Sequence, residues 1–401
     1  MQIHSEKKPY YPLIVFALCF SSISLIVSDF FGLLRLPEAV GKYIIYAIFI
    51  FFLVKCLLKN AFFQKYILLF FSLFLLLGLS YFLFQNTRSY ASDSIDRLVQ
   101  MFGVYLPAAI AFMYIDDYKK LLSALETPVY VLLIGLCLIH LIRPLDSMEL
   151  GIRLSVLYLL ALCTYSQKRR GLKIAILIVA FAFNFMAGRQ ALIIVLLGLA
   201  VFFFYGINRK LGKTATILLS AILIVLILAF YDNLLELLIN VLVKLGVSGR
   251  GIEKMMAEEV FDTSNRDWIY THLATTIKNN GIRVNGFFSD RYFLERTSHR
   301  VGYYAHNIIL EILVDFGWLF GSILCFLLFW LIVKAILKSH HEQRRLLLFI
   351  CIFTIVRLMV SSSFIVEGNF YLLMGMCISI LCHQRLASSN LLSKESIANE
   401  S

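Results

Sequence analysis

Residues 303–324 read YYAHNIILEILVDFGWLFGSIL and place titratable side chains directly before an apolar run. Asn307, Glu311 and Asp315 follow one another at intervals of four residues, so they share one face of a helix, whereas His306 points about 100° away from Asn307. A histidine with a reference pKa of about 6.5 can accept a proton near neutral pH, and neighbouring acids can adjust that pKa. His306 is therefore a candidate general base. A histidine that only hydrogen-bonds a loop carbonyl fits the pattern as well.

Arg189 is a candidate phosphate ligand. In FNFMAGRQALIIV it occupies a tight turn between two apolar segments, which sets the guanidinium at the level of the lipid headgroups. A planar guanidinium can hold a phosphate group with two parallel hydrogen bonds. An arginine that only extends its side chain to a lipid phosphate would occupy the same position.

Arg266, in NRDW, lies in the first turn of a predicted helix, where a positive charge opposes the helix dipole. It is either a candidate anion ligand or an ordinary surface arginine. The same polar segment contains further candidate anion ligands: Arg250, Arg283, Arg291, Arg296 and Arg300.

Arg357, in IVRLMVSSSF, lies inside an apolar segment. Charges within a membrane are costly and usually have a partner or face a wet cavity. Glu311 or Asp315 is the expected partner of Arg357, and an ion pair and a substrate contact both remain open.

The elements that position these residues are predicted to be membrane helices. Hydrophobic residues make up 60% of the chain and the mean hydropathy is +0.82. A spanning helix needs about 20 largely apolar residues. We therefore predict an all-α polytopic membrane protein with about twelve spans, near 10–28, 40–58, 66–84, 98–115, 124–142, 150–165, 172–187, 190–207, 214–231, 306–337, 346–365 and 369–383.

The net charge of +12 is explained by topology. Lys and Arg are concentrated in short alternating loops such as QKRRGLK and NRKLGK, as expected for cytoplasmic loops. Both termini are therefore predicted to be cytoplasmic, and no nucleic-acid partner follows from the charge. The eight cysteines lie in or beside apolar segments and are interpreted as core residues rather than disulfides or metal ligands.

Residues 232–304 form one long polar segment, predicted to lie on the outer face, with nine basic and nine acidic residues. Within it, TSNRDWIYTHLATTIKNNG indicates a helix that Ser264 caps, that presents Ile269 and Leu273 on one side, and that ends at Gly281. The next apolar run, 306–337, is longer than a bilayer requires, so a bend at Gly317 is expected. The predicted organisation is nine spans in 1–231, the outer loop 232–304, three spans in 305–385 and a cytoplasmic tail 386–401.

Several motifs are absent: GxxxxGK[ST], HExxH and GxSxG do not occur, so the sequence gives no support for ATP hydrolysis, zinc proteolysis or a hydrolase nucleophile. Asp29 and Glu38 resemble the acids of glycosyltransferases that use lipid-phosphosugars, which is a less favoured alternative.

The chain resembles the superfamily of bacterial O-antigen polymerases and O-antigen ligases. The resemblance rests on AGRQA between two apolar segments, NRDW and GIRVNGF in the long polar segment, and AHNIILEILVDFGWLFG after it. It implies an inner-membrane glycosyltransferase that uses glycans linked to undecaprenyl pyrophosphate as donor and acceptor.

The resemblance also implies roles for individual residues. Arg189 and Arg266 would hold or neutralise the pyrophosphate and His306 would lie at the reaction centre. Asn307, Glu311, Arg291 and Arg250 are further candidate substrate ligands. No metal or cofactor is expected, because arginines can supply the positive charge, and membrane lipids and a chain-length regulator are candidate partners.

We interpret the chain as a polymerase of O-antigen or capsule repeat units. A ligase that transfers the glycan to lipid A core or to protein shares these motifs and remains an alternative. A polysaccharide flippase also has about twelve spans, but it should line its centre with charges and lack a long outer loop with converging arginines.

Overall fold

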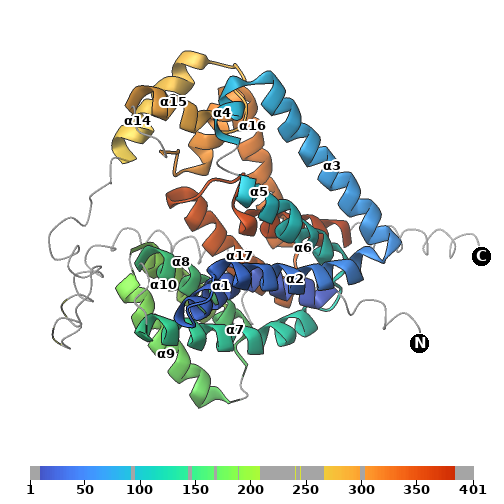
Figure 1. Cartoon of the computed structure of the whole chain (residues 1–401), viewed down its shortest axis with the longest axis vertical. Coiled ribbons are helices and arrows are strands. Elements are labelled where there is room, and N and C mark those ends of the chain that lie inside the picture. Colours follow the sequence, from blue (N-terminus) through green and yellow to red (C-terminus); the bar gives the residue numbers. More distant parts are fainter. Residues whose placement is uncertain are drawn as a thin grey trace, which may run out of the picture.

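The computed structural model describes residues 10–91, 95–142, 147–166, 169–187, 189–207, 266–298 and 303–383, together with residues 240 and 244. All regular secondary structure in these ranges is helical (Figure 1). The helices are α1 Tyr10–Leu33, α2 Glu38–Leu57, α3 Asn60–Leu83, α4 Gln85–Ala91, α5 Ile95–Gln100, a π-helix Met101–Tyr105, α6 Leu106–Ala111, a short 3₁₀-helix Phe112–Tyr114, α7 Tyr118–Ile142, α8 Ser147–Thr164, α9 Arg170–Ala187, α10 Arg189–Ile207, α14 Arg266–Asn280, α15 Ser289–Ser298, α16 Ile308–Lys338, α17 His341–Val360 and a last helix Gly368–His383.

The all-α prediction is confirmed for the described residues. Six of their helical segments are long and apolar enough to cross a membrane: Tyr10–Leu33, Val40–Leu57, Asn60–Leu83, Ile95–Tyr114, Tyr118–Ile142 and Ile308–Lys338. Each predicted span except 214–231 coincides with helix, and 214–231 lies outside the described residues. The total of twelve spans remains a prediction.

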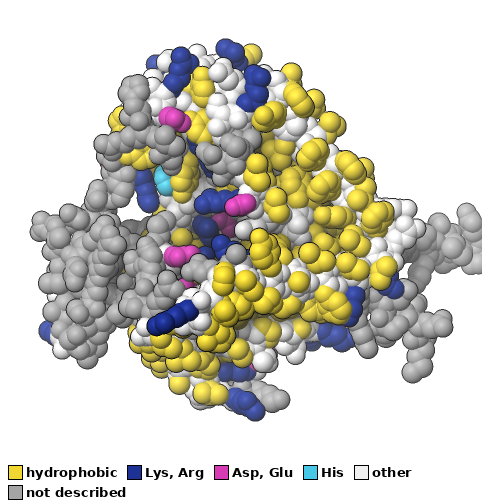
Figure 2. Space-filling model, viewed as in Figure 1, with side chains coloured by type: hydrophobic (Ala, Val, Ile, Leu, Met, Phe, Trp, Pro, Cys, Tyr) yellow, Lys and Arg dark blue, Asp and Glu magenta, His cyan; other side chains and the backbone are white. Residues whose placement is uncertain are grey.

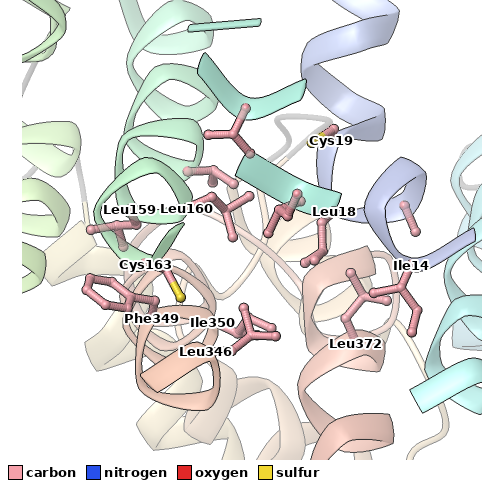
Figure 3. Packing of buried hydrophobic residues seen from close by; sticks show 14 of the residues in the cluster. Ile14, Leu18, Cys19, Leu159, Leu160, Cys163, Leu346, Phe349, Ile350 and Leu372 are labelled. Atoms are coloured by element: carbon pink, nitrogen blue, oxygen red, sulfur yellow. The ribbon is translucent and has the colours of Figure 1, made fainter. Parts of the chain in front are cut away.

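The main core is formed where α1, α7, α8, α10 and α17 pack together. Figure 3 shows apolar side chains of this core: Ile14, Leu18 and Cys19 of α1, Leu159, Leu160 and Cys163 of α8, Leu346, Phe349 and Ile350 of α17, and Leu372 of the last helix. The cysteines among them are buried and free, as predicted.

A helical cap lies at one end of the molecule. It consists of α14 and α15, which pack against the beginning of α16, while α15 also contacts α4 (Figure 1). The predicted helix α14 is confirmed: Ile269 and Leu273 are buried, and Gly281 follows its last residue with a φ of 59°. The predicted cap Ser264 lies outside the described residues.

The predicted bend at Gly317 is confirmed. Gly317 has a φ of 73° and a ψ of 162° inside α16. A Cβ at this position would lie 2.7 Å from the carbonyl oxygen of Arg283, so only glycine fits. The bend frees the carbonyl of Asp315, which accepts hydrogen bonds from the N–H groups of Asn285 (2.8 Å) and Gly286 (3.1 Å). The loop between α14 and α15 is thereby attached to α16.

Candidate functional site

A polar cavity of about 440 Å³ lies between α1, α5, α8, α17 and the loop that follows α17. Its charged lining residues are three arginines and two glutamates: Arg97, Arg153, Arg357, Glu149 and Glu367. Figure 2 shows basic and acidic side chains gathered in a hollow near the middle of one face, with apolar side chains around it. Such a concentration of charge within an apolar helical bundle usually marks a ligand site.

Arg357 forms an ion pair with Glu367, with 2.6 Å between Nε and Oε2. The same carboxylate accepts hydrogen bonds from Ser362 Oγ (2.8 Å) and from Asn369 Nδ2 (2.9 Å). The expected pairing of Arg357 with Glu311 or Asp315 is therefore wrong. Glu367 is buried, and the chain turns back after α17 to bring it to Arg357.

Arg153, on α8, is the second arginine of the cavity. Its Nη2 lies 2.7 Å from Oε1 of Glu149, one turn earlier on the same helix. Its Nη1 is buried and has no hydrogen-bond partner among the described residues. A buried guanidinium nitrogen that still has a hydrogen to donate can bind an anionic ligand.

The π-helix Met101–Tyr105 forms part of the same wall. Gln100, directly before it, and Tyr105, at its end, both line the cavity, and Arg97 lies one turn earlier on α5. The ring of Tyr105 packs so closely against Gly368 that a Cβ there would overlap it. Insertions of one π-turn into a helix occur frequently at functional sites.

Sequence reasoning missed Arg97 and Arg153. The signal for Arg153 was present, because it is a basic residue inside the predicted span 150–165. Arg97 immediately precedes a predicted span, and nothing local separates it from an ordinary interfacial arginine.

Tyr304 connects this cavity to the helical cap. Its hydroxyl donates to the carbonyl oxygen of Ser361 (2.6 Å), and Ser361 Oγ donates to Oε1 of Gln190 (2.9 Å). Burial raises the pKa of Tyr304. Four positive charges oppose this shift: Arg357, Arg97, Arg291 and Arg266. Arginines of the cavity and of the cap therefore act on the same side chain.

His306 lies beside Tyr304, with 3.7 Å between the ring centroids. Its backbone is left-handed, with a φ of 50°, and its buried Nδ1 has no hydrogen-bond partner among the described residues. Burial and the positive charge of Arg266 lower the pKa of His306 to about 4. The expectation that neighbouring acids adjust this pKa is not met, since the charged group that acts on it is a cation.

The three polar residues after His306 hold the local structure together. The Asn307 side chain caps α16, accepting hydrogen bonds from the N–H groups of Ile309 (2.9 Å) and Leu310 (3.3 Å). Glu311 is buried and accepts hydrogen bonds from the Ser363 hydroxyl and from the N–H of Phe364.

Asp315 is also buried and accepts a hydrogen bond from the N–H of Ser289 (2.9 Å). Next to Ser289, buried Asp290 accepts one from the N–H of Ala305 (2.7 Å), directly before His306. Desolvation on burial raises the pKa of Asp290. These acids position the loops around the site, and in the described part of the chain no cluster of acids, histidines or cysteines can hold a metal ion.

Of the remaining predicted residues, Arg291 lies close to Tyr304. The Arg291 guanidinium lies 4.9 Å from the Phe288 ring and 5.9 Å from the Tyr304 ring. Arg189 is the first residue of α10 and directly precedes Gln190. The side chain of Arg189 and the whole of Arg250 lie outside the described part of the chain.

Comparison of the chain with protein-family models, curated proteins and solved structures finds no match.

Proposed function

We propose that this protein is a glycosyltransferase of the bacterial inner membrane that polymerises undecaprenyl-pyrophosphate-linked repeat units into O-antigen or capsular polysaccharide at the outer leaflet. The observation that carries the proposal is the polar cavity lined by Arg97, Arg153 and Arg357. His306 lies outside its lining, next to Tyr304. Placing arginines within an apolar helical bundle costs free energy. Binding of an anionic substrate from the membrane would explain why these arginines are there.

The arginines match the leaving group of such a reaction. The acceptor hydroxyl oxygen forms a bond to the anomeric carbon of the donor, while the bond from that carbon to the pyrophosphate oxygen breaks. The leaving pyrophosphate takes the electron pair and gains negative charge. Fixed guanidinium groups stabilise this charge most effectively in a site of low dielectric.

His306 is the candidate acceptor of the hydroxyl proton. With its pKa at about 4, the imidazole is neutral at physiological pH and is available as a base. Arg266 disfavours the imidazolium form, so the proton is readily passed on to the leaving pyrophosphate or to water. The pyrophosphate leaving group already activates the donor, so the reaction consumes no nucleotide.

Removal of Arg153 tests the role of the cavity. Its partner Glu149 is exposed, so Arg153→Gln leaves no carboxylate buried and unpaired. Purified protein given lipid-linked repeat units should form a polymer ladder, and the variant should lose about 10²-fold or more in rate. Arg88→Gln removes an exposed arginine of α4 and is the matched control.

Ladder formation by Arg153→Gln at the wild-type rate, with equal protein abundance, would remove the cavity from the mechanism. Activity that appears only when lipid A core is supplied as acceptor would assign the protein as a ligase instead.

A further inference from the structure

A second cavity lies between α7 and α9 and has a volume of about 410 Å³. It shares no lining residue with the polar cavity described above. One end is polar and is lined by Glu126, Arg169 and Lys173, whereas the rest is lined largely by apolar side chains, Val131, Ile134, Leu172 and Ile176. We call this cavity the α7–α9 groove.

The polar end of the groove has a fixed arrangement. Lys173 is buried and forms an ion pair with Glu126, and its Nζ also donates to Ser166 Oγ (2.7 Å). Ser166 Oγ in turn donates to Glu126 Oε1 (2.8 Å). The charge of Lys173 is therefore compensated within the protein, and exposed Arg169 supplies the additional positive charge of the lining.

The apolar part of the groove faces outwards. Val131 is 60% exposed, Ile134 40% and Leu172 59%, which leaves a continuous aliphatic surface beside the charged end. Ile134 lies eight residues beyond Glu126 on α7, about 12 Å along the helix axis. A ligand that fills this groove must have an anionic end and an apolar chain.

We propose that the α7–α9 groove binds one phospholipid with an anionic headgroup. The headgroup phosphate contacts Arg169, at the end of the groove where Lys173 is held by Glu126, and one acyl chain runs along Val131 and Ile134. Helix α7 is long and apolar enough to cross a membrane, so its exposed aliphatic residues are in contact with lipid when it does.

The charge pattern favours an anionic lipid over a zwitterionic one. Residues 166–173 contain Lys168, Arg169, Arg170 and Lys173 and no acid, which predicts a cytoplasmic position facing an anionic leaflet. A free phosphate ion would use only the charged end and leave the aliphatic walls without a ligand. The proposal does not depend on the enzymatic function proposed above.

Native mass spectrometry of the full-length protein in detergent tests this proposal, with phosphatidylglycerol, phosphatidylcholine or inorganic phosphate added. We expect retention of one phosphatidylglycerol in preference to phosphatidylcholine. Arg169→Gln should weaken this binding about tenfold, as expected for the loss of one charge-assisted contact. Ile134→Trp, which keeps every charge but fills the apolar part, should also weaken it.

Lys55→Gln is the matched control, because Lys55 is an exposed lysine in the last turn of α2 and lies outside the groove. Equal loss of phosphatidylglycerol from Lys55→Gln and Arg169→Gln would mean general charge attraction and would overturn the proposal. Unchanged binding to Ile134→Trp would overturn it too, even if Arg169→Gln fails to fold. Displacement of the lipid by millimolar inorganic phosphate would show a simple anion site instead.

Discussion

At the scale of single residues, His306 has features that a purely structural histidine would not need. Its backbone is left-handed and its Nδ1 is buried without a hydrogen-bond partner in the described part of the chain. An unsatisfied buried polar atom costs about 1–3 kcal/mol, and backbone strain of this kind is concentrated at functional sites. A substrate hydroxyl that approaches this nitrogen would satisfy it, which favours a role in contact with the substrate.

The cationic neighbour of His306 gives a prediction about pH. Burial and Arg266 lower the pKa of His306 to about 4, so neutral imidazole persists well below pH 6.5. If His306 is the base, kcat/KM should stay constant as the pH falls from 7 to about 5 and should decrease only near pH 4. Arg266→Gln removes the positive charge, so the pKa of His306 should rise and the acidic decrease should move to higher pH. Polymerisation rates measured across this pH range give the result.

Arg88→Gln is the control for that experiment, since Arg88 is an exposed arginine of α4. Its pH profile should match that of the wild type. His306→Gln should lower the rate about 10²–10⁴-fold, because glutamine cannot accept the proton. An acidic limb that keeps the same midpoint in Arg266→Gln would argue that His306 is not the titrating base.

The same lowered pKa affects stability. The unfolded chain binds a proton at His306 below about pH 6.5, whereas the folded protein does so only near pH 4. The free energy of unfolding therefore decreases as the pH falls through this window. His306→Gln removes this contribution, so its unfolding should depend less on pH between 6.5 and 4.

The sequence predicted which types of residue take part in the site better than it predicted which residues contact one another. Arg357 stood out in the sequence as a charge in an apolar segment, and the structure places it in the polar cavity. Its partner could not be predicted, because Glu367 reaches it only through the turn of the chain after α17. Glu311 was an expected partner of Arg357, yet its carboxylate accepts hydrogen bonds from residues 363 and 364.

At the scale of secondary-structure elements, the boundaries that could be predicted were those set by residues at the helix ends themselves. Asn307 begins α16 because its side-chain oxygen accepts the first free N–H groups of the helix, and asparagine is among the preferred residues for this position. The end of α14 at Gly281 follows the usual preference for glycine after a helix. The π-helix before α6 has a different local signal, since Pro107 follows it inside the helical segment and cannot donate a hydrogen bond to the preceding turn.

Gly317 gives a prediction at this scale. Gly317→Ala places a Cβ at a backbone conformation that only glycine adopts readily, 2.7 Å from the carbonyl oxygen of Arg283. We expect a decrease of about 1–3 kcal/mol in the free energy of unfolding from the strained conformation. The amides of Asn285 and Gly286 should also exchange hydrogen faster, because both donate to the Asp315 carbonyl beside the bend. Thermal unfolding in detergent and hydrogen exchange measure these effects.

Gly78→Ala is the matched control. Gly78 lies within α3, and a Cβ there would meet no atom within 4 Å. Alanine is preferred to glycine inside a helix, so this variant should be as stable as the wild type or slightly more stable. If the two variants unfold at the same temperature and exchange equally fast at Asn285, the bend does not require glycine.

At the scale of the whole molecule, a junction next to the polar cavity combines segments that are distant in sequence. Tyr304 before α16, Ser361 after α17 and Gln190 on α10 are joined by two successive hydrogen bonds. No local pattern predicts such a junction, because each residue is ordinary in its own segment. Gln190, His306 and Arg266 come from three separate segments of the sequence, and all three lie at this junction or act on Tyr304 within it.

Membrane topology determines whether this junction can perform the proposed reaction. Tyr304 lies between Tyr303 and Ala305, which pack against helix α14, so the junction at Tyr304 and helix α14 are predicted to face the same side of the membrane. The distribution of Lys and Arg predicts that this side is the outer one. Lipid-linked glycans for polymerisation are presented at the outer leaflet, so the opposite orientation would separate the site from its proposed substrate.

Two cysteine reporters test this orientation in a background without the native cysteines. Asn279→Cys labels an exposed position of α14, and Lys120→Cys labels an exposed position in the first turn of α7. A membrane-impermeant maleimide should react with Asn279→Cys in spheroplasts with an intact inner membrane, because α14 is predicted to be outside. It should react with Lys120→Cys only after the membrane is opened, because residues 116–126 are predicted to be cytoplasmic. The reverse pattern would place the junction at Tyr304 on the cytoplasmic side and exclude polymerisation at the outer leaflet.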